Sequence, residues 1–265
     1  MTFTLGPRAT EAGYRLIVHD RLDSTNSEAL RLARSGERGP LWIVAREQTA
    51  GRGRRGREWV SADGNLAASL LFAAEVAPAV AATLGFVASL AVREACCALA
   101  PGVDVALKWP NDVLANGGKV AGLLLESETQ GSSLAMVVGI GVNLASAPEG
   151  MPFPAQSLRA LGHVVTAERA LADLSDAWVS LAALWNEGRG FQVIREAWLA
   201  QARGIGQSIS VRTGDRVDSG TFETLDEQGR LILCAADGTM RTISAGDVYF
   251  GDAASETSSS VGAAS

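Results

Sequence analysis

The chain has 265 residues, of which 47% are hydrophobic and 20% are charged. This length suits one catalytic domain with a smaller second domain, and this hydrophobic content argues against disorder outside the chain ends. The formal net charge of -6 excludes the overall basic character of many nucleic-acid-binding proteins, so an anion would need a local basic cluster.

The cysteines and the apolar stretches point to a reduced, cytoplasmic protein. Cys96, Cys97 and Cys234 have neither the spacing of a zinc site nor a pairing framework, so buried thiols are expected. The longest apolar stretch, Ala77–Ala91, contains Pro78 and falls short of the roughly 20 residues of a membrane span. We therefore expect a soluble protein without a metal held by a protein cage.

Strands and helices are expected to alternate in the first part of the chain. A strand at Tyr14–His19 precedes a helix whose start, with Thr25 and Glu28, fits a capping box. Pro78, at a first-turn position, predicts one long helix to about Ala100. A turn is expected from Pro110 to Gly118. Further strands are predicted at Leu41–Ala45, Asn65–Phe72, Val105–Trp109, Lys119–Glu126 and Leu134–Asn143.

The composition changes near Ile205. Before it, helices are expected at Thr166–Asn186 and Phe191–Ala202. After it come short strands with polar turns, a pattern typical of a small barrel. These strands are predicted at Ser208–Arg212, Asp218–Thr224, Leu231–Cys234 and Thr239–Ile243. The Ser/Ala-rich end is expected to be a disordered tail.

Residues 51–56 form a basic glycine loop with the sequence Gly-Arg-Gly-Arg-Arg-Gly. The loop matches G-x-G-x-x-G, and Glu75 lies where a dinucleotide site has an acid. That interpretation fails because turn residues, and no helix, follow the motif. Glycines allow close approach and guanidiniums bind phosphate or carboxylate, so we interpret the loop as a mobile anion clamp. A solvated basic loop or a nucleic-acid contact remains the alternative.

Five segments together resemble the biotin–protein ligase family. In chain order they are residues 23–26 (Asp-Ser-Thr-Asn), 48–56 (ending in the basic loop), 107–113 (Leu-Lys-Trp-Pro-Asn-Asp-Val), 118–126 (Gly-Lys-Val-Ala-Gly-Leu-Leu-Leu-Glu) and 139–144 (Gly-Ile-Gly-Val-Asn-Leu). Some members carry an N-terminal helix-turn-helix domain that represses transcription. Only a short arm precedes Tyr14 here, so the resemblance is to the monofunctional type without a DNA-binding domain.

The resemblance implies an α/β fold, with a mixed sheet and flanking helices like those of class II aminoacyl-tRNA synthetases, plus a C-terminal SH3-like β-barrel. The expected domains are a catalytic domain at 1–204, the barrel at 205–252 and the tail at 253–265. It also implies an ATP-dependent ligase. Biotin's carboxylate attacks the α-phosphate of ATP, pyrophosphate leaves, and a lysine of a carrier protein takes the biotinyl group from biotinyl-5′-adenylate.

Biotin contacts are implied for residues at the ends of two predicted elements. Ser24, Thr25, Asn26 and Gln48 match the family's biotin-binding segments. Their hydroxyl and amide groups suit the ureido group of biotin, which offers a carbonyl acceptor and N–H donors.

The basic loop is implied to hold the phosphate. Arg52, Gly53 and Arg54 match the clamp over the carboxylate and phosphate, and Arg52 is also assigned a catalytic role. Trp59 matches the family's residue that stacks on adenine. The alternative is a core tryptophan, and the turn residues around Trp59 count against it.

Lys119 matches the catalytic lysine, which would stabilise charge on the α-phosphate and later on the carbonyl oxygen. Asp112 is its expected catalytic partner, and it could orient Lys119, assist Mg²⁺ brought by ATP, or deprotonate the incoming lysine. The remaining expected substrate contacts are Lys108, Asn111, Gly122 and Asn143.

The expected partners are biotin, ATP with Mg²⁺, and the biotin carboxyl carrier domain of acetyl-CoA carboxylase or a related carboxylase; DNA and membranes are not expected. A monomer and a homodimer are both compatible with the sequence. One rival is a lipoate–protein ligase or octanoyl transferase on the same fold. Another is a non-enzymatic nucleic-acid-binding regulator that uses the basic loop.

Overall fold

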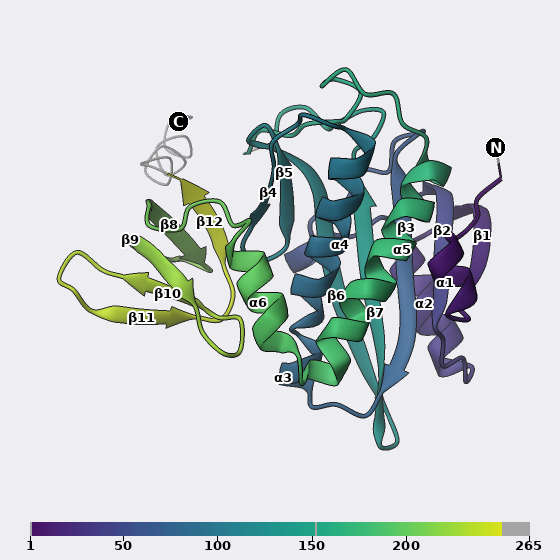
Figure 1. The fold of residues 1–265 in the computed structure, drawn as a ribbon, viewed down its shortest axis with the longest axis horizontal. Coiled ribbons are helices and arrows are strands. Elements are labelled where there is room, and N and C mark those ends of the chain that lie inside the picture. The colour runs from purple at the N-terminus through teal and green to yellow at the C-terminus, as the bar shows by residue number, and fades with distance from the viewer. Residues whose placement is uncertain (1, 152, 251–265) are drawn as a thin grey trace, which may run out of the picture.

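A seven-stranded mixed sheet forms the centre of the larger domain. The computed structural model describes residues 2–151 and 153–250, and Figure 1 shows their arrangement. The strand order is β1-β2-β3-β7-β6-β5-β4, with β1 and β2 parallel and the other neighbours antiparallel. The strands are β1 (Arg15–Leu22), β2 (Leu41–Gln48), β3 (Leu66–Ala74), β4 (Val105–Lys108), β5 (Asp112–Ala115), β6 (Gly118–Gln130) and β7 (Ser133–Val142).

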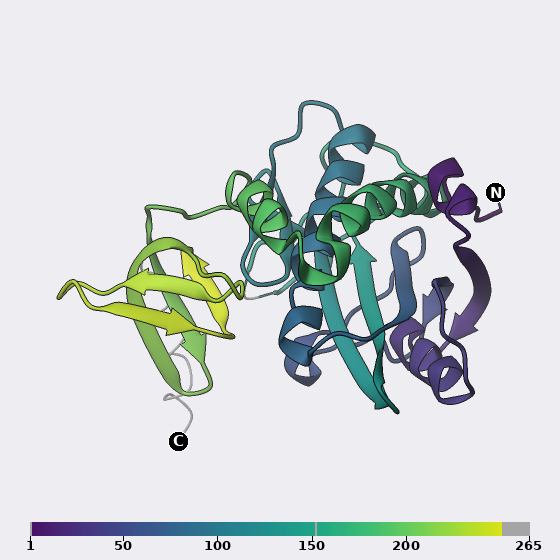
Figure 2. The same ribbon diagram turned by 60° about the horizontal axis from the view of Figure 1, so that its bottom comes forward.

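Helices cover both faces of this sheet unequally (Figure 2). One face carries α4 (Leu84–Leu99), α5 (Ala167–Trp185) and α6 (Phe191–Leu199), while α2 (Thr25–Arg34) lies on the other. Two shorter helices, α1 (Pro7–Glu11) and α3 (Pro78–Ala81), flank α5 and α4. Single 3-10 turns occur at Arg54–Gly56 and Asn186–Gly188.

The side chains of β2 alternate between the two faces of the sheet, and this explains why helices pack on both sides. Trp42 and Val44 point into the large core with α4 and α5, whereas Leu41 and Ile43 pack in a smaller cluster under α2. Successive side chains of a strand point to opposite faces, so a fully apolar run is buried by helices on both sides. Because α2 is short, it covers only part of its face, and the remainder is left for a pocket.

A five-stranded antiparallel sheet forms the C-terminal part, in the order β11-β10-β9-β8-β12. Its strands are β8 (Ser208–Thr213), β9 (Arg216–Leu225), β10 (Leu231–Cys234), β11 (Met240–Ile243) and β12 (Asp247–Phe250). Trp109 joins the two parts by donating from Nε1 to the Gly229 carbonyl at 3.0 Å. The predicted mixed fold with an SH3-like second part is confirmed; the boundary between 204 and 205 stays a prediction.

Several expectations from the sequence were wrong in detail. The long helix is two, because a turn at residues 82–83 separates α3 from α4. The expected turn at 110–118 contains β5, a strand that pairs on both edges. Thr25 does not form a capping box: Ser24 is the N-cap, without a side-chain cap bond, and the Thr25 hydroxyl bonds Gln48.

Four further segments complete the comparison with expectation. The arm before Tyr14 contains α1, and strand β12 was not foreseen. The predicted tail lies outside the described residues. Pro78–Leu99 is long and apolar enough to cross a membrane by composition, but 67% of its most apolar window is buried within the protein, as in a core helix.

Candidate functional site

Glycines form the floor of a pocket on the face of the sheet that α2 leaves uncovered. A Cβ at Gly122 would lie 2.9 Å from the Trp59 ring, and a Cβ at Gly141 would collide with the same ring. At Gly139 a Cβ would collide with the Asn26 amide. These strand positions therefore lack side chains where the α2 start and the basic loop approach the sheet.

Buried polar side chains line one end of this pocket. Ser24, Thr25 and Asn26 begin α2 and are at most 4% exposed. Gln48 ends β2, and its Oε1 accepts bonds from the Thr25 backbone N–H at 2.8 Å and the Thr25 hydroxyl at 3.1 Å. Ser69 of β3 lies 2.6 Å from Asn26 Oδ1 and 2.7 Å from Thr25 Oγ1. A hydrogen-bonded network therefore fixes these groups before any ligand is present.

The positions of the protons in this network determine which donors and acceptors remain free for a ligand. The Ser69 hydroxyl has a single proton for two acceptors, Asn26 Oδ1 and Thr25 Oγ1, because the Thr25 proton is donated to Gln48. The Asn26 Nδ2 donates to Glu126 Oε2 at 2.7 Å and to the Leu124 carbonyl at 3.3 Å. Asn26 thus keeps an unused acceptor lone pair. The Ser24 hydroxyl has no hydrogen-bond partner among residues 2–151 and 153–250, so it is available as a donor.

An ion pair lies on the wall of the same pocket. Lys119, near the start of β6, places Nζ 2.6 Å from Oδ1 of Asp112 at the start of β5. The two side chains are 29% and 16% exposed, so the pair is reachable but largely shielded from water. The Lys119 ammonium also lies 5.8 Å from the centre of the Trp59 ring. A cation held beside an aromatic face suits a site for an anionic group next to a planar base.

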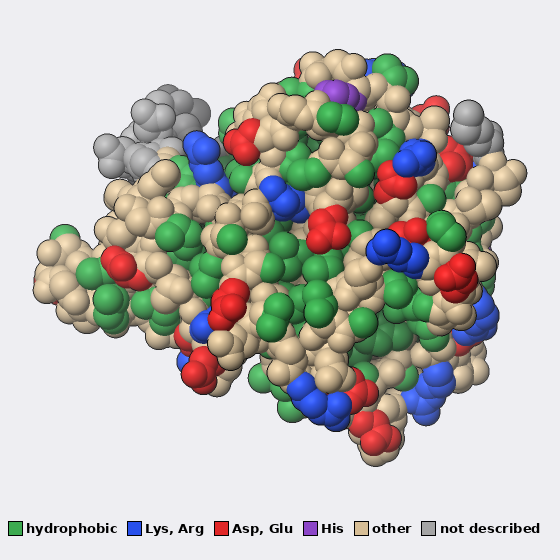
Figure 3. Space-filling view, viewed as in Figure 1, with side chains coloured by type: hydrophobic (Ala, Val, Ile, Leu, Met, Phe, Trp, Pro, Cys, Tyr) green, Lys and Arg blue, Asp and Glu red, His purple; other side chains and the backbone are tan. Residues whose placement is uncertain are grey.

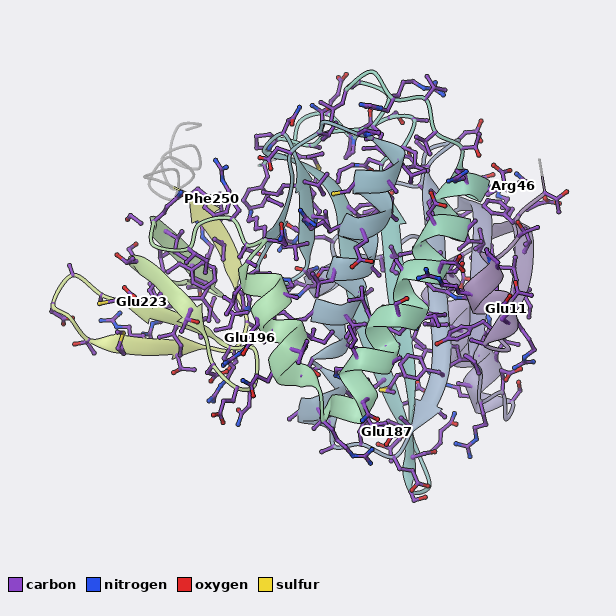
Figure 4. All side chains as sticks on the ribbon, viewed as in Figure 1. Glu11, Arg46, Glu187, Glu196, Glu223 and Phe250 are labelled. Atoms are coloured by element: carbon purple, nitrogen blue, oxygen red, sulfur yellow. The ribbon has the colours of Figure 1, made fainter. Side chains whose placement is uncertain are left out.

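A second lysine lies deeper. Lys108 is 6% exposed, and its Nζ lies 4.0 Å above the Phe153 ring and 5.5 Å from the Phe250 ring. Phe250 comes from the end of β12 and is labelled in Figure 4. Burial lowers the pKa of Lys108, although Asp112 nearby opposes this. Within the described chain this ammonium has no ion pair, so it is a cation without an anion.

Asn143 presents an unused acceptor at the end of β7. It is 2% exposed, its Nδ2 donates to the Lys119 carbonyl at 3.4 Å, and its Oδ1 has no partner among the described residues. Unsatisfied buried acceptors are uncommon in proteins, so a ligand group is the simplest explanation.

The basic loop and the adjacent Arg57 are held over the pocket by ion pairs to two strands, β6 and β12. Arg52 pairs with Glu126 of β6 at 3.1 Å. Asp247 of β12 pairs with both Arg55, at 2.9 Å, and Arg57, at 2.6 Å. Burial opposes ionisation of Asp247, but these arginines outweigh it and lower the pKa of the carboxyl. The smaller sheet therefore helps to hold the loop.

Arg54 differs from its neighbours in the loop. Its Nη1 donates to Asn111 Oδ1 at 3.0 Å, and Asn111 Nδ2 in turn donates to the Leu123 carbonyl at 2.6 Å. No carboxylate of the described chain pairs with Arg54, and burial lowers the pKa of its guanidinium. Arg54 is thus the loop arginine with the most to gain from a bound anion.

All residues predicted from the sequence line this one pocket: Ser24, Thr25, Asn26, Gln48, Arg52, Gly53, Arg54, Trp59, Lys108, Asn111, Asp112, Lys119, Gly122 and Asn143. Their individual roles stay predictions. Sequence reasoning missed Ser69, Glu126, Phe153 and Asp247. Ser69 could have been found, because a serine inside the apolar strand at 66–74 is unusual. Glu126 could also have been found, because it is the last residue of the recognised motif at 118–126. Nothing local marks Phe153 or Asp247, because only the tertiary fold brings them to the pocket.

The described residues hold no metal-ligand cluster, and the face shown in Figure 3 carries no broad basic surface. Among the described residues, no three His, Cys, Asp or Glu side chains are grouped to hold an ion. Acidic and basic side chains are interspersed on the face seen in Figure 3. The basic loop engages its own protein's carboxylates, which weakens the interpretation of it as a nucleic-acid contact.

Comparison with known proteins gives concordant matches. Residues 18–143 match the family described as "Biotin/lipoate A/B protein ligase family", and residues 204–251 match "Biotin protein ligase C terminal domain". A biotin–[acetyl-CoA-carboxylase] ligase of Paracoccus denitrificans is 47% identical over 87% of this chain and 98% of its own. One from Mycobacterium tuberculosis is 34% identical, over 89% and 90%. The solved biotin protein ligase of Aquifex aeolicus in complex with biotin and ATP has a TM-score of 0.74 and 26% identity, over 89% and 98%.

Proposed function

The chain belongs to the biotin protein ligase family, and from this premise we propose that it activates biotin with ATP and transfers it to a lysine of a carboxylase carrier domain. One observation carries the proposal in this chain. The Lys119–Asp112 pair lies in the same pocket as the buried polar network and the basic loop. That arrangement suits an acid activated at its carboxylate by a nucleotide.

Biotin fits with its ureido ring at the buried end of the pocket. The Ser24 hydroxyl can donate to the ureido carbonyl, and Asn26 Oδ1 can accept a ureido N–H. The valerate chain then lies along the glycine floor, and its carboxylate comes near Lys119. The adenine stacks on Trp59, and Asn143 Oδ1 accepts a bond from the adenosine. Stacking of a base on an aromatic ring contributes about 1–3 kcal/mol in other proteins.

The first half-reaction joins the two substrates. A carboxylate oxygen of biotin forms a bond to the α-phosphorus, the bond to the bridging oxygen breaks, and pyrophosphate leaves. Lys119 and Arg54 stabilise the charge that builds on the α-phosphate oxygens. Lys108, buried and without an anion, is placed to hold the phosphates that leave. Asp112 orients the Lys119 ammonium through their 2.6 Å contact.

The second half-reaction consumes the adenylate. The amine of the carrier lysine forms a bond to the acyl carbon, the bond from that carbon to the phosphate oxygen breaks, and AMP leaves. The surplus proton of the amine passes to solvent. Lys119 stabilises the negative charge on the carbonyl oxygen during this step, so one residue serves both half-reactions.

Magnesium would enter with ATP. Among the described residues no group of His, Cys, Asp or Glu side chains could form a cage for it. Proteins commonly bind Mg²⁺ through one carboxylate and the substrate's phosphates. Asp112 would be that carboxylate, and it would have to share its charge between the ion and the Lys119 ammonium. The ion would supply further neutralisation of the phosphate charge.

Biotin is favoured over lipoate by the C-terminal match and by relatives named for biotin. We propose that the protein acts in the cytoplasm, where carboxylases are made. The test incubates the protein with biotin, Mg·ATP and an acetyl-CoA carboxylase carrier domain, and measures the carrier's mass. A gain of one biotinyl group supports the proposal. A parallel melting experiment should show stabilisation by biotin and none by lipoate; the reverse would favour the lipoate enzyme.

A further inference from the structure

Glu126 lies between the two ends of the pocket and bonds both. Its Oε2 accepts from Asn26 Nδ2 at 2.7 Å and from Arg52 Nη2 at 3.1 Å, while Oε1 lies 3.2 Å from the same nitrogen. Asn26 is 3% exposed, whereas the Arg52 side chain is 44% exposed. One carboxylate thus connects a buried amide to a loop at the surface.

Arg52 uses only one of its nitrogens in this contact. Both hydrogen bonds to Glu126 come from Nη2, so Nη1 and Nε remain available to an anion. Glu126 can therefore keep its hold on Arg52 while the guanidinium contacts a phosphate. A partner that holds one edge of a guanidinium reduces the freedom that the side chain loses when it binds, which is a form of preorganisation.

The same carboxylate fixes the amide of Asn26. Because Nδ2 donates to Glu126, Oδ1 is directed toward Ser69 and the pocket. A continuous chain of hydrogen bonds runs from Ser69 through Asn26 and Glu126 to Arg52. We propose that Glu126 is a positioning residue, which orients Asn26 for biotin and holds Arg52 and the loop closed over the adenylate.

This inference rests on the proposed function, because it concerns retention of the adenylate that the function produces. It predicts that removing Glu126 speeds release of the adenylate. Simple competition between Glu126 and the ligand for Arg52 would predict slower release. If Glu126 only withheld Arg52 from the ligand, its removal would tighten adenylate binding. If Glu126 positions Arg52, its removal loosens the loop and speeds release.

The variant Glu126→Gln separates the two tasks. Glutamine keeps an oxygen that can accept from Asn26 Nδ2 but removes the charge that holds Arg52. Glu128→Gln is the matched control, because Glu128 lies on the same strand but pairs with Arg34, which does not line the pocket, whereas Glu126 bonds Asn26 and Arg52, which do. Each full-length protein is loaded with biotin and Mg·ATP, and release of labelled adenylate is followed after a chase with unlabelled biotin and ATP. Biotin affinity is measured separately without ATP.

For Glu126→Gln we expect release about two- to fivefold faster, the scale for losing a partly exposed ion pair, with biotin affinity unchanged. Glu128→Gln should match the parent in both. In an Arg52→Gln background the Glu126→Gln effect on release should disappear, since the two residues act together. Glu126→Ala, which also removes the Asn26 acceptor, should weaken biotin binding as well.

Release that is unchanged or slower in Glu126→Gln would overturn the inference. An equal loss of biotin affinity and adenylate retention in Glu126→Gln would also overturn it, because it would indicate a general structural role. If the parent protein itself forms no adenylate, the proposed function fails first, and the two failures are therefore distinguishable.

Discussion

Replacing Lys119 with alanine should abolish most turnover while leaving the fold intact. Its ammonium is a preorganised cation, held 2.6 Å from Asp112 in a shielded pocket. Removing one such charge-stabilising donor lowers turnover on the order of 10²–10³-fold, or roughly 2.7–4 kcal/mol. Since Lys119 serves both half-reactions in this account, the overall loss should reach or exceed that range. Stability should change little, because a partly exposed ion pair contributes about 0–1 kcal/mol.

The assay measures the two half-reactions separately. Pyrophosphate release reports adenylate formation, and supplied biotinyl-adenylate with carrier domain reports transfer. Lys119→Arg is the matched variant, since it keeps the charge but changes the donor geometry, and its activity should fall between those of the parent and Lys119→Ala. Melting temperatures serve as the folding control. Near-normal rates in a properly folded Lys119→Ala protein would remove Lys119 from the mechanism.

Further perturbations address the loop, the smaller sheet and the buried lysine. Arg52→Gly should still make adenylate but release it about tenfold to a hundredfold faster, because one charge-assisted contact is lost. Arg54→Gly should release adenylate at least as fast, because Arg54 has no carboxylate partner among the described residues. Streptavidin blots of bystander albumin measure this leak, and unlabelled albumin with parent-like release would contradict it. Truncation at about Gly204 removes Asp247 from the pocket and should strongly weaken ligation; a soluble fragment that labels its carrier at full rate would exclude a role for the smaller sheet. Burial lowers the pKa of Lys108, so between its folded and unfolded pKa values the unfolded state binds more protons and stability rises with pH. Lys108→Met should therefore raise the melting temperature most at neutral pH, less toward the ordinary pKa of lysine, and reduce adenylation; a stability gain that does not vary with pH would contradict this.

Most strands were predictable because their burial pattern is local. The apolar run at 41–45 and the run from 134 are buried on both faces, and this leaves a clear signature in the sequence. Strand β5 was not predictable, because it has only four residues between polar turns. Its pairing to β4 and β6 arises only in the folded chain. The break before α4 lies at Thr83, whose hydroxyl accepts a bond from Trp185 at 2.8 Å, over a hundred residues away, so its surroundings were not visible in the local sequence.

The residues of the pocket were predictable from motifs, but the hydrogen bonds and ion pairs that connect them were not. The five segments that resemble the family contain the predicted residues, and the fold brings them together. Their partners come from elsewhere: Arg52 meets Glu126, and Arg55 and Arg57 meet Asp247 in the last strand. No spacing rule connects residues so far apart in the chain. Sequence reasoning gave Arg52 a catalytic role and Arg54 only a ligand contact, whereas the structure pairs Arg52 with a carboxylate and leaves Arg54 without one among the described residues.

The most direct test of the central claim is the mass of a carboxylase carrier domain after incubation with this protein, biotin and Mg·ATP. The account predicts the addition of one biotinyl group, dependent on both biotin and ATP and absent when the acceptor lysine of the carrier is replaced by arginine. A carrier of unchanged mass, with the protein folded and its melting temperature raised by biotin, would contradict it.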